Sequence, residues 1–123
     1  MTDTTHSPRN LILIRDPLIA DDLDTALAEM HPDHVVVRVA DIDDATDALA
    51  TVQDVRVVVL ELGPAELSSS ALQLALAAHD ARVILFGPAA ERAAEDSPWP
   101  VLHRPFGSDS LRRLIAPEGP PET

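Results

Sequence analysis

Charged side chains stand directly after three apolar runs of this sequence. Arg15 and Asp16 follow the first run, Glu61 follows the third, and Arg104 lies just beyond the last. Carboxylate oxygens are ligands that Mg²⁺ accepts, and a guanidinium binds a carboxylate or a phosphate through two parallel hydrogen bonds. These residues therefore have the chemistry of an ionic site, provided that the fold brings the ends of the apolar runs together.

The histidines do not predict a metal site. They are His6, His31, His34, His79 and His103. His31 and His34 are three residues apart, but Pro32 interrupts that stretch, so we expect both on a loop. The chain has no cysteine to supply a thiolate ligand, and its four glycines form neither of the usual phosphate-binding patterns. We expect no metal and no cofactor.

Two polar clusters have plain structural explanations. Ser68, Ser69 and Ser70 have no histidine near them in sequence, so we interpret them as a helix start and not as nucleophiles. The acidic residues from Asp41 to Asp47 could bind cations. They are more typical of a helix N-terminus, where negative charge complements the helix dipole.

Five short apolar, β-branched runs predict the strands. They are Leu11–Ile14, Val35–Val39, Val55–Leu60, Val83–Phe86 and the shorter Val101–His103. The first four are nearly continuous, which is typical of strands buried on both faces of a parallel sheet. Helical patterns lie between and after the runs. They are Pro17–Met30, Asp43–Thr51, Ser68–His79, Ala89–Asp96 and Ser108–Ile115.

Strands and helices alternate five times, which predicts a three-layer α/β fold with a parallel sheet between helices. Five strands favour the flavodoxin-like order 2-1-3-4-5, whose ligand crevice lies at the carboxyl ends of the first and third strands. We expect one domain over residues 10–116, with disordered tails at 1–9 and 117–123.

Composition excludes several classes of function. The net charge is −12 and all nine basic residues are arginine, with no basic patch for nucleic acid. No apolar run is long enough to span a membrane, and the polar first ten residues do not resemble a signal peptide. The absence of cysteine fits a reducing compartment, so we expect a cytoplasmic protein.

Four segments, in order, resemble those of bacterial response-regulator receiver domains. They are the first run with Arg15-Asp16-Pro17, Asp54–Pro64, Ala81–Gly87, and Val101–Phe106 followed by Leu111 and Ile115. The resemblance covers roughly residues 10–116 and implies a role in two-component signal transduction or a phosphorelay. In that family an Asp after the third strand accepts a phosphoryl group. Acids after the first strand bind Mg²⁺, and a Ser or Thr and a Lys steady the phosphoryl oxygens.

This chain departs from the family at each of those positions. The acceptor is Glu61, whose extra methylene moves the carboxylate by about 1–1.5 Å. Misplacement on that scale can cost on the order of 10²-fold in rate. Arg15, with Asp16 beside it, stands where the acids bind Mg²⁺, and Gly87 replaces the hydroxyl residue. Arg104 replaces the Lys, and no change of register restores one because the chain has no lysine.

Three further expectations concern the same residues. A guanidinium at Arg15 would compete with Mg²⁺ and pair with Glu61 or Asp16. The longer Glu61 could instead mimic a phosphorylated Asp. The resemblance also implies a cis peptide bond before Pro105.

We therefore predict a degenerate, non-enzymatic receiver that acts by protein–protein interaction without normal Asp phosphorylation. Its partner would be a kinase, a regulator or a second copy, bound through the face made by the fourth and fifth strands and the last helix. Candidate interface residues are Trp99, Phe106 and Leu111, although Trp99 could instead close the edge of the core. The alternatives are residual phosphoryl acceptance by Asp16 or Glu61 with Mg²⁺, and a flavodoxin-like domain binding a small ligand.

Overall fold

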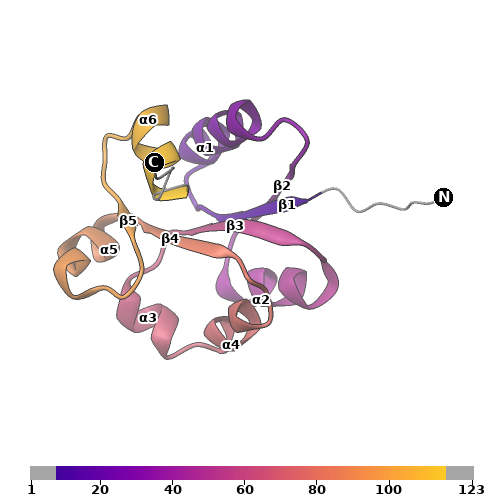
Figure 1. Ribbon diagram of the computed structural model, residues 1–123. Coiled ribbons are helices and arrows are strands. Elements are labelled where there is room, and N and C mark those ends of the chain that lie inside the picture. The colour runs from indigo at the N-terminus through magenta and orange to yellow at the C-terminus, as the bar shows by residue number, and fades with distance from the viewer. Residues whose placement is uncertain (1–7, 116–123) are drawn as a thin grey trace, which may run out of the picture.

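Five parallel strands form one sheet in the order β2-β1-β3-β4-β5 in the computed structural model, which describes residues 8–115 (Figure 1). The strands are β1 (Arg9–Leu13), β2 (Val35–Val39), β3 (Val55–Leu60), β4 (Arg82–Phe86) and β5 (Val101–Leu102). The predicted fold class and strand order are confirmed. Since β1 begins at Arg9, the ordered fold starts before residue 10. Residues 1–7 and 117–123 of the predicted tails lie outside the described residues.

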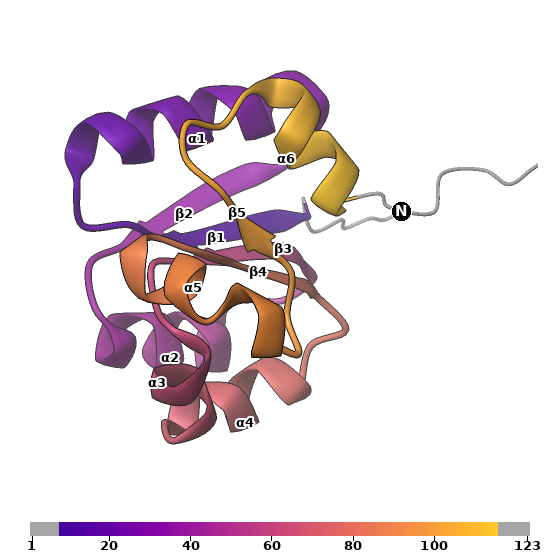
Figure 2. The ribbon, with the colours of Figure 1, turned by 90° about the vertical axis from the view of Figure 1, so that its left-hand side faces the viewer.

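Helices cover both faces of the sheet, as Figure 2 shows. They are α1 (Pro17–Met30), α2 (Ile42–Thr51), α3 (Pro64–Ser68), α4 (Ala71–Ala77), α5 (Pro88–Arg92), the 3₁₀ helix η1 (Ala94–Asp96) and α6 (Ser108–Ile115). Helices α1 and α6 pack on one face, and α2 to α5 pack on the other. Each face has its own aliphatic core, because successive strand residues point to opposite sides.

The predicted helix Ser68–His79 is wrong at its start. The chain forms α3 from Pro64 and begins α4 only after a break at Ser69 and Ser70. Pro64 suits the first turn of a helix, where its missing N–H is not needed. The Ser69 hydroxyl donates to the Ala65 carbonyl at 3.0 Å, and Ser69 is the C-cap residue of α3. Ser70 is the N-cap residue of α4, without a side-chain capping bond. The predicted Ala89–Asp96 helix likewise divides into α5 and η1.

The outermost strand β2 is less buried than its sequence predicts. Its valines are only partly covered, and Val35 is 47% exposed. An apolar run in an edge strand therefore looks the same in sequence as one in the centre of the sheet. The central strands behave as predicted, since Ile12, Val58 and Val59 are fully buried.

The amino end of the sheet holds a small polar cluster. Asn10 is completely buried, and its Oδ1 lies 3.2 Å from Nδ1 of His34. The His34 ring stacks on His31 with a centroid separation of 4.3 Å. Burial lowers the pKa of His34 from its ordinary value of 6.5, and the neighbouring charges of His31 and Arg56 lower it further. Asp54 and Asp33 oppose this shift.

This cluster makes stability depend on pH in a predictable direction. Because the pKa of His34 is lower in the folded chain, the unfolded chain binds the proton first as the pH falls below 6.5. The free energy of unfolding should therefore fall between pH 6.5 and the lowered pKa of the folded state. His34→Gln should reduce this slope in urea titrations at a series of pH values. Equal slopes in the wild type and the variant would contradict the assignment.

Candidate functional site

The carboxyl ends of β1 and β3 bring Arg15 and Glu61 into direct contact. The Glu61 N–H donates to the Leu13 carbonyl at 2.8 Å, which continues the β1–β3 ladder by one residue. The half-buried Glu61 side chain then turns toward the start of the next loop. Its Oε1 accepts the main-chain N–H of Arg15 at 2.7 Å. The predicted meeting of these two residues is therefore found, through the backbone of Arg15.

The expected guanidinium–carboxylate pair is not what joins them. Among the described residues, the only hydrogen bond from the Arg15 guanidinium goes to the main-chain oxygen of Glu61, at 3.4 Å. That distance is long for a hydrogen bond. The carboxylate is thus held by an N–H that almost any residue at position 15 would supply. The Arg15 side chain lies at the same end of the sheet as the carboxylate, so its positive charge would oppose the binding of a dication there.

Gly87 leaves space beside the Glu61 side chain. Its φ of 102° lies in the left-handed region that favours glycine, and a Cβ built there would come within 3.1 Å of Glu61 Cγ. Few real Cβ atoms approach a neighbour so closely. A side chain on residue 87 would therefore press on the Glu61 side chain, which would have to shift by a few tenths of an ångström. The sequence indicates only that a hydroxyl is missing here.

A shallow hollow of about 350 Å³ opens beside this contact. Its lining includes Arg15, Glu61 and Gly87 together with Glu66 and Arg92. Asp16 and Arg104 do not line it. The hollow thus holds two arginines and two glutamates, and within the described residues no three histidine or acidic groups gather as a metal site would need.

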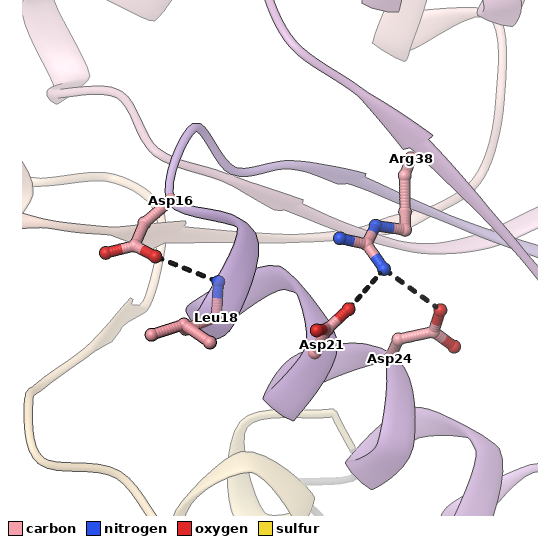
Figure 3. Close-up of polar contacts among 5 residues, drawn as sticks. All are labelled: Asp16, Leu18, Asp21, Asp24 and Arg38. Carbon is pink, nitrogen blue, oxygen red and sulfur yellow. Dashed lines mark hydrogen bonds and ion pairs between the residues drawn. The ribbon is translucent and has the colours of Figure 1, made fainter.

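Asp16 belongs to helix α1 instead of the crevice. Its side chain accepts the Leu18 N–H at 2.9 Å, which caps the helix just before Pro17 (Figure 3). Such a cap satisfies one of the main-chain donors that every helix start leaves without a partner. The Asp16 carboxylate, which could have bound a cation, instead caps the start of α1.

Arg104 is also bound within its own chain, to Glu91, which the sequence does not indicate as a partner. Its guanidinium makes two hydrogen bonds to the Glu91 carboxylate, at 2.9 and 3.2 Å, and its main-chain N–H adds a third at 3.1 Å. These bonds lower the pKa of the Glu91 carboxyl and raise that of Arg104. The following peptide bond, to Pro105, is cis, as the resemblance implies. No spacing rule links Arg104 with an acid thirteen residues earlier.

The three interface candidates do not share one surface. Trp99 is half-buried and packs on the core cluster that α2 to α5 cover, as its alternative interpretation expected. Phe106 packs on the opposite side, where it meets Phe86 edge-to-face at 5.9 Å. Leu111 is fully buried, so its inclusion among the interface residues is wrong. Its apolar position on α6 reflects the core face of that helix.

Known proteins resemble this chain in structure more than in sequence. No family model matches it, and no curated protein matches it. A crystal structure of a mutant of the anti-anti-sigma factor PhyR from Bartonella quintana matches 90% of this chain with a TM-score of 0.67 and 24% identity. The match spans 48% of that longer chain. The predicted receiver-like fold is confirmed.

The close approach of Glu61 to Gly87 gives a stability prediction. Gly87→Ala should destabilise the protein by about 1–3 kcal/mol, since it adds a Cβ against Glu61 at a φ that disfavours alanine. The matched control is Gly107→Ala, where nothing lies within 4 Å, and it should change stability by less than about 0.5 kcal/mol. The double variant of Gly87→Ala with Glu61→Ala should lose less than the sum of the two single losses in urea unfolding, because Glu61→Ala removes the Cγ that the new Cβ would meet. Additive losses would mean that the two residues are not sterically coupled.

The assignment of Asp16 as a cap gives a second prediction. Asp16→Ala should cost about 1 kcal/mol of unfolding free energy, and Asp16→Asn should be nearly neutral because asparagine caps helices equally well. If Asp16 bound Mg²⁺ instead, the ion would raise the melting temperature of the wild-type chain and Asp16→Asn would remove that rise. Thermal melts with and without Mg²⁺ distinguish the two roles.

Proposed function

We propose that this chain is a receiver-like signalling domain that regulates by binding a protein partner, without phosphorylation at the third-strand position. The observation that supports this most strongly is the contact of Glu61 with the Arg15 N–H, over the space that Gly87 leaves free. The groups at the carboxyl ends of the strands bond within the chain, and none is placed to position a phosphoryl group.

Three features of the site support the loss of phosphoryl transfer. Transfer of a phosphoryl group needs cations and donors placed where charge develops. Here Arg104 is bound to Glu91, and Asp16 is bound to the start of α1. The chain contains no lysine that could replace Arg104. An intact acceptor in these surroundings would lack both its metal ligands and its counter-charge.

The structural neighbour is named an anti-anti-sigma factor. We extend to this chain only the idea of a non-enzymatic bacterial regulator working through another protein, in the cytoplasm. The partner, a kinase, another regulator or a second copy, would meet the β4–β5–α6 side, where Phe106 remains partly exposed. Within the described residues no helix is long and apolar enough to cross a membrane.

The expected result of a labelling experiment is no phosphorylation. The full chain is incubated with acetyl phosphate and Mg²⁺ and measured by intact-mass spectrometry, with an active receiver domain as the positive control. A stable, base-labile phosphoryl adduct would overturn the proposal. If an adduct forms, Glu61→Gln and Asp16→Asn show which acid carries it, which tests the alternative of residual phosphoryl acceptance.

A further inference from the structure

The outer edge of β2 carries main-chain groups that no described residue pairs. The Val35 N–H donates inward to the Pro8 carbonyl at 2.9 Å. Main-chain direction alternates along a strand, so Val37 and Val39 also face β1 while Val36 and Arg38 face outward. No described strand lies beyond β2, and no described main-chain group bonds to Val36 or Arg38. Two N–H and two C=O groups therefore point away from the sheet.

The two edges of the sheet differ in how well they resist further pairing. Strand β5 is only two residues long, and prolines at 98, 100 and 105 flank it closely. Short edge strands and prolines are common ways of preventing edge-to-edge association. Strand β2 has five residues, no proline and four valines, and valine is among the best strand formers. Strand β2 therefore lacks the features that keep β5 from pairing with another strand.

The one charged side chain on β2 is held by its own chain. Arg38 lies 2.7 Å from Asp21 and 3.8 Å from Asp24, both on α1 (Figure 3). Its charge is thereby partly offset, and the side chain is drawn toward the α1 face of the sheet. A free lysine or arginine on an edge would discourage a second strand, but this guanidinium already has partners.

We propose that β2 pairs with β2 of a second copy of this chain, antiparallel and about a two-fold axis through Val37. In this register each Val36 faces Arg38 of the other copy, so all four outward groups of each strand form hydrogen bonds. Val37 faces Val37, and Val35 faces Val39, which places valine against valine on one side of the sheet.

The two neighbouring registers of the β2–β2 pair are less stable. Moving the axis to Arg38 sets two guanidiniums opposite each other, and like charges in that position are destabilising. Moving it to Val36 requires the main-chain N–H of His34, which already donates to His31 at 3.0 Å. The strand is therefore self-complementary in one arrangement, which is why a second copy is the occupant that we infer.

Charge sets the conditions in which the pair forms. Each chain carries a net charge of −12. The two-fold axis keeps both α1 helices on the same face of the extended sheet, so their acidic residues approach one another. Salt screens such repulsion, so the dimer should be weak at low ionic strength and stronger in added salt. Pairing through β2 does not involve the hollow beside Glu61, because no β2 residue lines that hollow.

A single cysteine tests this register directly, since the chain has none of its own. Opposed residues in a non-hydrogen-bonded antiparallel pair come close enough for a disulfide. Under mild oxidation at high salt, Val37→Cys should form a covalent dimer that non-reducing gels detect. The control is Leu74→Cys, which is more exposed at 77% but lies on α4, and it should remain mostly monomeric. Equal cross-linking of the two variants would overturn the proposal.

Sedimentation velocity of the full chain gives a second, reversible test. The wild type should dimerise with rising concentration, more strongly at high salt. Val35→Lys should weaken the dimer by about tenfold, because the two-fold axis places the new charge against Val39 twice. Leu74→Lys changes the net charge equally and should leave association as in the wild type. A wild type that stays monomeric in all conditions, or a dimer that Val35→Lys does not weaken, would refute pairing through β2.

Discussion

The register between β1 and β3 determines what the carboxyl edge of this protein can do. Leu13 stands opposite Leu60, so the next residue of the third strand, Glu61, meets the turn that leaves the first. The buried side chains on both faces of these strands hold this register, because a shift of one residue would turn every side chain to the other face. The contact between Glu61 and the Arg15 N–H follows directly from that constraint. Strand β4, paired with β3 on its other side, then places Gly87 beneath the same carboxylate.

Three charged residues at the carboxyl ends of the strands are bound by their own chain. Glu61 accepts a main-chain N–H, Asp16 caps a helix, and Arg104 binds Glu91. By contrast, the Arg15 guanidinium makes one long hydrogen bond, to the main-chain oxygen of Glu61 at 3.4 Å.

Most of the fold could be predicted from the sequence, because β-branched runs and helical spacing act within a few residues of each other. The order of the strands followed from alternation and the handedness of parallel connections. The capping role of Asp16 was also within reach, since an Asp just before a Pro is a common helix start. The ion pair of Arg104 with Glu91 was not, because it joins residues thirteen positions apart through the fold. Nor could the left-handed φ of Gly87 be distinguished from an ordinary turn.

Four of the described arginines are paired with acids of the same chain, and this favours association through main-chain groups. Arg38, Arg56, Arg104 and Arg112 each pair with an acid of the same chain. With 21 acidic residues against nine arginines, the remaining acids give the surface a strong negative charge. A partner that relied on side-chain charge would have to be basic, which excludes a second copy of the chain. Main-chain hydrogen bonds carry no net charge and are the same on every copy, so a strand edge lets identical acidic chains associate where their side chains alone would repel.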